Sequence, residues 1–124
     1  NGRPARVSSV DTLARAVVLT SDVNGMDRAG HGAAFRRVTQ RCAYTRTWGD
    51  CYGHALVATG RAEAIFDPKL ALWDAAPLLP IIEMAGGSFT TLDGRATHTG
   101  GDGVATNAAL AAEFRRLFHA TEEA

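Results

Sequence analysis

Apolar and polar positions alternate along the chain with two different periods, one typical of strands and one of helices. The run from Ala16 to Leu19 is entirely apolar, which is long enough for a buried strand and too short for a helix. Between Arg61 and Phe66 every second residue is apolar, as in a strand with one buried face. The segments predicted to be strands are Arg6–Val10, Arg15–Thr20, Tyr44–Trp48, Arg61–Phe66, Gly87–Leu92 and Val104–Thr106.

Helical spacing of apolar residues predicts two amphipathic helices. Phe35, Val38 and Cys42 recur at this spacing with arginines between them, which predicts a helix over Asp27–Ala43, although two glycines weaken its start. A final helix after Asn107 is expected to bury one apolar face. The residues of that face are Leu110, Phe114, Leu117 and Phe118.

Polar residues and glycines mark the ends of the two remaining helices. Asp50 is predicted to cap a helix over Cys51–Thr59, which Gly60 ends. Asp74 opens a helix that runs to about Ala85. We expect this helix to tolerate one proline, Pro77, in its first turn and to be loosened or kinked by a second, Pro80.

Strands alternate with helices along most of the 124 residues, as in an α/β domain. We therefore predict an open, mixed but mostly parallel sheet with helices on both faces, built as one domain. Asp93–Gly94 and Gly100–Gly103 are predicted to be turns, because neither is followed by the pattern that a phosphate-binding or calcium-binding loop needs.

Composition excludes several classes of protein. The chain is 46% hydrophobic and 21% charged with a formal net charge of zero, which is typical of a soluble globular domain. The basic pairs Arg36–Arg37 and Arg115–Arg116 lie on predicted helices and favour solvated faces over a nucleic-acid-binding stripe. No apolar run approaches the roughly 18 residues of a membrane span. We expect a cytoplasmic protein without nucleic-acid or membrane partners.

The cysteines and histidines show no metal-binding pattern. Cys42 and Cys51 lie on predicted helices without CxxC spacing, so we expect reduced, mostly buried thiols rather than a disulfide or a zinc site. The histidines are scattered and form no HxxxH or HExxH motif. They are His31, His54, His98 and His119.

The most informative chemistry lies in the segments Trp73–Ala76 and Ile81–Gly87. Asp74 stands at a helix start beside a bulky aromatic residue. A carboxylate in this position accepts backbone N–H groups, which keep it ionised and fix its direction, and magnesium prefers such oxygens together with phosphate and water. Taken alone, an aspartate at a helix start is most often a simple cap.

The string WDAA followed by IIEMAGG resembles the second signature of the inositol monophosphatase superfamily, from which Met84 is a departure. Asn1–Ser8 is similar to the strand that closes the first domain of that family, and Val104–Asn107 to its last strand and helix cap. The whole chain therefore resembles the carboxyl-terminal half of the family's αβαβα fold. The resemblance implies that Asp74 ligates a catalytic Mg²⁺.

The family's earlier signatures, a Glu-Glu pair and a DPxDGT segment that supply most metal ligands, do not precede the WDAA segment in the 124 residues. The DPxDGT segment occurs nowhere, and the one Glu-Glu pair, Glu122–Glu123, stands at the end of the sequence. The chain also begins at Asn1 without a methionine. We therefore expect residues 1–124 to be a carboxyl-terminal domain whose amino-terminal, metal-binding half is absent. One aspartate cannot hold two metal ions about 3.5–4 Å apart, so the chain alone is expected to be inactive. The expected partners are the missing half, a small phosphorylated substrate and a second copy in a homodimer.

The segments RTWGDCYGH and DPKLALWDAAPLLPIIE look like the histidinol-phosphate phosphatase branch of the superfamily, since an aspartate follows Gly49. Carboxylates pair with the ammonium and imidazole groups of histidinol phosphate but are poorer partners for a neutral polyol. The resemblance places Gly49, Asp50, Asp67 and Asp74 at the substrate, with Asp67 and Asp50 at its amino-alcohol and imidazole end.

Alternatives stay open for several of these residues. Asp50 is equally well explained as a helix cap. Tyr52 and His54 are candidates for the lining of the pocket, but an aromatic residue and a histidine on one helix are more often packing residues. The leading hypothesis is a magnesium-dependent phosphomonoesterase that hydrolyses histidinol phosphate in histidine biosynthesis. The alternatives are an inositol- or sugar-phosphate phosphatase, and a domain that folds and associates without catalysing a reaction.

Overall fold

The computed structural model describes residues 1–121, in which five strands form one sheet in the order β2-β1-β3-β5-β4. The neighbours β2, β1 and β3 are parallel, whereas β5 runs antiparallel to both β3 and β4. The strands are β1 (Val17–Thr20), β2 (Tyr44–Arg46), β3 (Ala64–Asp67), β4 (Ser88–Thr90) and β5 (Gly103–Thr106). The predicted mixed, mostly parallel sheet is therefore confirmed.

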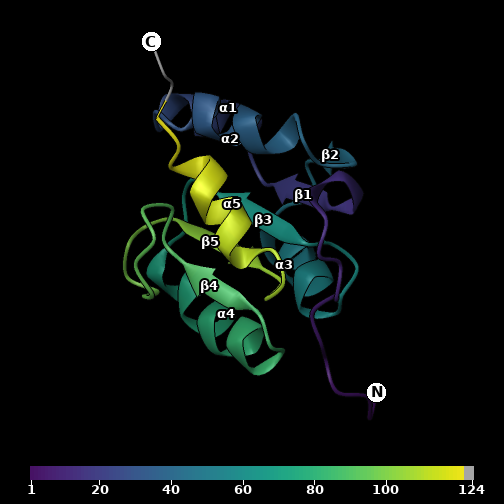
Figure 1. Ribbon diagram of the computed structural model, residues 1–124. Helices are drawn as coiled ribbons and strands as arrows, with labels where there is room; N and C mark the ends of the chain where they lie inside the picture. The colour runs from purple at the N-terminus through teal and green to yellow at the C-terminus, as the bar shows by residue number, and fades with distance from the viewer. Residues whose placement is uncertain (122–124) are drawn as a thin grey trace.

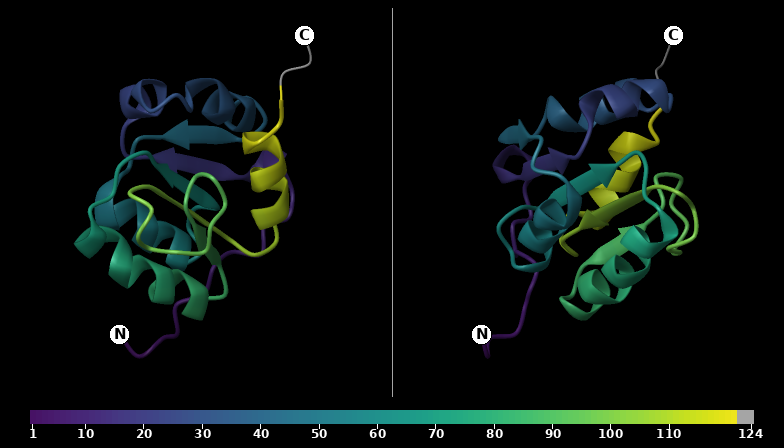
Figure 2. Two further views of the ribbon diagram at one scale, coloured as in Figure 1. Left: turned by 90° about the vertical axis from the view of Figure 1, so that its left-hand side faces the viewer. Right: turned by 180° about the vertical axis from the view of Figure 1, so that it is seen from behind.

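Helices cover both faces of this sheet, as Figures 1 and 2 show. A short 3₁₀ turn (Leu13–Arg15) leads into β1. The α-helices are α1 (Val23–Arg28), α2 (Gly32–Thr39), α3 (Asp50–Ala58), α4 (Leu72–Met84) and α5 (Ala111–Phe118). Helices α2 and α5 pack together on one face, and α3 and α4 pack together on the other.

Side chains of the central strands alternate between two cores, because successive residues of a strand point to opposite faces. Val18 and Phe66 belong to the core under α2 and α5, whereas Leu19 and Ile65 belong to the core under α3 and α4. All four are at most 1% exposed. The apolar run in β1 is thus explained by burial on both sides.

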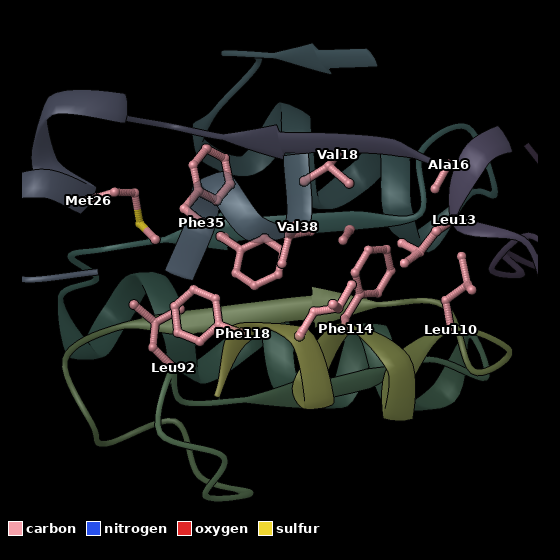
Figure 3. Close-up of a cluster of buried hydrophobic side chains, with 13 residues drawn as sticks. Leu13, Ala16, Val18, Met26, Phe35, Val38, Leu92, Leu110, Phe114 and Phe118 are labelled. Atoms are coloured by element: carbon pink, nitrogen blue, oxygen red, sulfur yellow. The ribbon is translucent and has the colours of Figure 1, made fainter. Parts of the chain in front are cut away.

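The core under α2 and α5 is rich in aromatic rings (Figure 3). Phe66 of β3 stacks on Phe118 at 5.2 Å between ring centroids and meets Phe114 edge to face at 6.2 Å. The apolar face predicted for the final helix is confirmed, because its four residues are all buried in this core.

The structure corrects the helix predicted over Asp27–Ala43. Helices α1 and α2 replace it, and Gly30 between them has φ +83°, a left-handed conformation that ends a helix. The apolar spacing nevertheless holds across the break, since Phe35 and Val38 are both buried. Cys42 lies beyond the end of α2.

Two further predictions about the cysteines and the second half of the chain need correction. Cys42 and Cys51 are both free, but Cys51 is exposed on α3 rather than buried. Pro77 lies in the second turn of α4 rather than the first, because this helix begins at Leu72. Helix α4 continues through Pro77 and Pro80 to Met84.

The segment Arg6–Val10 takes no part in the sheet, so its prediction as a strand is wrong. The backbone N–H of Val7 donates to the carbonyl of Ala85 at the end of α4 (3.0 Å). The side-chain amide of Asn107 donates to the carbonyls of Ser8 (3.3 Å) and Val10 (2.8 Å). These partners provide hydrogen bonds to backbone groups of the segment that a neighbouring strand would otherwise bind.

Asn107 is fully buried and also accepts a hydrogen bond from the N–H of Leu110 (3.1 Å), at the turn that precedes α5. We predict that Asn107→Ala lowers the free energy of unfolding by about 2–3 kcal/mol, because it leaves the buried N–H of Leu110 and the half-buried carbonyls of Ser8 and Val10 without this partner. Urea denaturation measures this loss. The exposed Asn24 of α1 supplies the control. Equal losses for Asn107→Ala and Asn24→Ala would contradict the prediction.

Candidate functional site

The candidate site lies where the chain reverses its direction of travel across the sheet. From β1 the chain moves outward to β2 and then crosses back to β3 on the other side of β1, with α2 and α3 on opposite faces. In open α/β sheets, ligands bind in the crevice outside the carboxyl ends of two such strands. Ser21 follows β1 directly and Asp67 is the last residue of β3. Both border a cleft at this edge.

The cleft has a volume of about 430 Å³ and is formed by the ends of β1 and β3 and the first turns of α3 and α4. This volume lies within the range of sites for small molecules. The residues that line it are Ser21, Asp22, Asp50, Cys51, His54, Asp67, Pro68, Lys69, Leu70, Asp74 and Leu78. Three of the four residues predicted to contact substrate, Asp50, Asp67 and Asp74, are therefore brought together.

Asp67 forms part of the cleft wall but is only 4% exposed. Its Oδ1 accepts a hydrogen bond from the Ser21 hydroxyl (2.6 Å). Its Oδ2 lies 3.6 Å from Nε2 of His54, which is also buried. One carboxylate oxygen of Asp67 is thus held by a hydrogen bond, and the other lies beside the imidazole of His54.

Asp74 is an exposed residue in the first turn of α4. It is the third residue of the helix rather than its cap, and its Oδ2 accepts from the N–H of Ala71 (3.3 Å). This bond fixes the carboxylate near the positive end of the helix and leaves it open to the cleft.

The donor set at Asp74 fits a magnesium ion, which is often held by one or two carboxylates together with phosphate and water. Within residues 1–121, no cluster of three His, Cys, Asp or Glu side chains is arranged to hold a metal. Asp74 would therefore act as one ligand among several. The other ligands would be water, phosphate or residues beyond this cleft.

The prediction that Asp50 caps α3 is wrong. Gly49 occupies the cap position, and Asp50 is the first residue of the helix with φ 55°, a left-handed conformation that is uncommon outside glycine. Non-glycine residues in this conformation cluster at ligand sites. A Cβ on Gly49 would overlap Ser21, so Gly49 lies tightly against the segment that follows β1.

The sequence did not predict that Ser21, Asp22 and Lys69 would line the cleft, as they do in the structure. Ser21 and Asp22 follow the apolar run of β1 directly, and the position of this run before a polar pair was a usable signal, because ligands gather at the ends of parallel strands. Asp22 forms an ion pair with Arg28 (2.8 Å). Lys69 carried no comparable signal.

The two aromatic residues considered for the pocket differ in their environment. Tyr52 is 59% exposed, meets Trp48 edge to face at 6.5 Å and is not part of the cleft lining. His54 lines the cleft from its buried side. The structure thus separates a surface tyrosine from a histidine beside Asp67.

Acidic groups outnumber basic ones in the cleft. Four aspartates line it, of which Asp22 is paired with Arg28, and Lys69 is the only Lys or Arg among the described residues of the lining. Carboxylates in a concave surface raise the local concentration of cations. The cleft is therefore suited to a metal ion, to a cationic ligand or to both.

The model of the inositol monophosphatase family matches residues 1–123, nearly the whole chain. The chain belongs to the inositol monophosphatase family. The resemblance seen in the WDAA and IIEMAGG segments is thereby confirmed. The chain is 39% identical over 106 residues to a histidinol-phosphatase of Chlorobaculum parvum, covering 84% of this chain and 40% of the relative.

A histidinol-phosphatase of Streptomyces coelicolor is 36% identical over 104 residues, covering 84% of this chain and 39% of that protein. The fold matches an inositol monophosphatase from Zymomonas mobilis with a TM-score of 0.86 at 24% identity, covering 97% of this chain and 48% of that one. The chain thus spans less than half the length of these relatives. Among its described residues, no helix has the length and apolar character needed to cross a membrane.

Proposed function

We propose that this chain is the carboxyl-terminal domain, residues 1–124, of a cytoplasmic, magnesium-dependent phosphomonoesterase that hydrolyses histidinol phosphate to histidinol and phosphate. The acidic cleft carries the proposal, because it brings Asp50, Asp67 and Asp74 to the edge where parallel strands end. The relatives named histidinol-phosphatase support the same substrate, since the two described above are 39% and 36% identical to this chain.

Each carboxylate has a distinct place in this function. Asp74 holds Mg²⁺ and is directed by the N–H of Ala71. The bound metal ion supplies charge stabilisation for the transferring phosphoryl group. Asp67 and Asp50 bind the ammonium and imidazole end of the substrate, and Gly49 keeps the first turn of α3 close to Ser21. Charge-assisted pairs of this kind favour histidinol phosphate over an uncharged alcohol ester.

The remaining metal ligands and the groups that activate water are proposed to come from an amino-terminal half of the enzyme, and the complete enzyme to form a homodimer. The proposal of a further half, though not that of a homodimer, is supported by the length of the relatives, of which the chain covers 40% and 39%. The DPxDGT signature is also absent from residues 1–124, and no Glu-Glu pair precedes the WDAA segment.

A second candidate function is an inositol- or sugar-phosphate phosphatase. It is favoured by the fold, which matches an inositol monophosphatase with a TM-score of 0.86. An uncharged polyol would leave Asp50 and Asp67 without a cationic partner. The ratio of the catalytic efficiencies for histidinol phosphate and inositol phosphate separates the two candidates.

The proposal is tested with a chimeric enzyme in which this chain replaces the matching stretch of the Chlorobaculum parvum relative. We predict that the chimera hydrolyses histidinol phosphate in the presence of Mg²⁺, whereas the 124-residue chain alone has negligible activity at any Mg²⁺ concentration. Phosphate release measures both. The remainder of the relative without this chain is the control.

Two outcomes would count against this function. A folded chimera that prefers inositol phosphate would assign the cleft to a polyol. Robust turnover by the chain alone, surviving repurification, would mean that residues 1–124 hold a complete catalytic site and not one of its two parts.

A further inference from the structure

His54 is a buried histidine whose ring nitrogens take no part in the hydrogen bonds of the described residues. The residue is 2% exposed, and within the described part of the chain neither Nδ1 nor Nε2 has a hydrogen-bond partner. Its ring faces that of Phe89 at 6.3 Å between centroids. Buried polar groups are nearly always hydrogen-bonded, so an unpartnered imidazole in the wall of a cleft calls for a reason.

Helix α3 is built to hold this imidazole at the end of β3. A Cβ on Gly53, the residue before His54, would overlap the carbonyl of Trp48 and press on Ile65. Gly49 at the start of the helix lies equally close to Ser21. Larger residues at either glycine would push α3 away from the sheet. This close approach sets Nε2 of His54 3.6 Å from Oδ2 of Asp67.

Asp67 is therefore flanked on both sides. The Ser21 hydroxyl donates to Oδ1 at 2.6 Å, and His54 faces Oδ2 at a distance slightly too long for a hydrogen bond. Hydrogen bonds within a site are often long before the ligand is present and tighten in the complex. A complex in which His54 also donates to Oδ2 would hold the carboxylate at both oxygens and keep its remaining lone pairs in fixed directions.

We propose that His54 is a positioning residue for substrate specificity, which donates its Nε2–H to Asp67 and, together with Ser21, holds that carboxylate in the orientation that binds the cationic end of the substrate. This inference rests on the proposed function, in which Asp67 contacts histidinol. It explains why a histidine with two unpartnered nitrogens lies beside a nearly buried aspartate.

A histidine that only fills space would behave differently on substitution. Phenylalanine has a ring of similar size and suits the apolar contact with Phe89, so His54→Phe would then preserve the specificity of the enzyme. His54→Gln, in contrast, keeps an N–H donor but loses the ring. The two variants therefore separate donation from packing.

The first experiment measures kcat/KM of the chimeric enzyme for histidinol phosphate and for a small neutral phosphate ester. His54→Phe is expected to lower the ratio of the two efficiencies about tenfold, the effect of one hydrogen bond to a charged group, whereas His54→Gln changes it less than about threefold. In an Asp67→Asn background, His54→Phe is expected to have no further effect on the ratio.

Val57→Ala is the matched control, because Val57 is buried on the same helix and does not line the cleft. It destabilises the fold and leaves the ratio of efficiencies unchanged. An unchanged ratio in His54→Phe, or equal effects of this substitution with and without Asp67, would overturn the proposal.

The second experiment needs no activity and so separates this inference from the proposed function. Long-range ¹⁵N–¹H spectra of the 124-residue chain report which nitrogen of His54 carries a proton. We expect a protonated Nε2, and we expect its ¹⁵N signal to move in Asp67→Asn. If the chimera fails to hydrolyse histidinol phosphate, the proposed function fails while these spectra still test the pairing. An unprotonated Nε2 with the proton on Nδ1 would contradict the proposed donation from His54 to Asp67.

Discussion

Asp74→Asn in the chimeric enzyme is expected to lower kcat/KM for every phosphate substrate by roughly two orders of magnitude or more, because a neutral amide is a much weaker magnesium ligand than a carboxylate. The melting temperature is expected to change little. Among the described residues, the Oδ2 of Asp74 accepts only the N–H of Ala71, at 3.3 Å, and the amide oxygen of asparagine can accept the same bond. Phosphate-release assays and thermal denaturation measure the two effects.

Glu83→Gln supplies the matched control for Asp74→Asn. Glu83 is an exposed carboxylate on the same helix and lies outside the cleft. Its removal changes the charge of α4 by the same amount without reaching the site. If Asp74→Asn lost activity and melting temperature in equal measure, or if Glu83→Gln were equally inactive, Asp74 would be a structural residue and the proposed metal ligand would be wrong.

Local patterns in the sequence were sufficient for most of the sheet. The apolar run of β1 and the helical spacing of Phe114 and Phe118 in α5 predict elements that the structure contains. Burial of one or both faces of an element produces a regular pattern of apolar residues in its sequence. The same kind of pattern gave a wrong prediction at α2, where one long helix was expected. Phe35 and Val38 are buried at the spacing expected of one long helix. The left-handed conformation of Gly30 nevertheless ends the first helix before them. Periodicity records which residues are buried and not whether the helix between them is continuous.

The site depends on information that local patterns do not contain. Asp74 and Asp67 were assigned through a family resemblance, and the structure places both at one cleft, although it does not test their roles. The approach of His54 to Asp67 follows from the order of β1 and β3 in the sheet and from the small residues that let α3 approach it. Neither condition can be derived from the spacing of residues along one helix.

Asp67→Asn is predicted to change the specificity of the chimeric enzyme more than its general activity. A charge-assisted contact contributes roughly 1.5–3 kcal/mol, so the preference for histidinol phosphate over a small neutral phosphate ester should fall about ten- to a hundredfold. Loss of metal binding would lower the catalytic efficiency for both substrates together, as expected for Asp74→Asn. Loss of a contact to the substrate's cation lowers the catalytic efficiency only for the substrate that carries the cation.

The buried position of Asp67 makes this substitution clean. Asparagine has nearly the same shape, and its amide oxygen can still accept the hydroxyl of Ser21, which now lies 2.6 Å from Oδ1. Asp27→Asn is the control, because Asp27 pairs with Arg36 at the surface and does not line the cleft. If the ratio of efficiencies is the same in Asp67→Asn as in the parent chimera, Asp67 does not bind the substrate's cation. The buried carboxylate would then serve to anchor Ser21 and the end of β1, and the preference for histidinol phosphate would have to arise from Asp50.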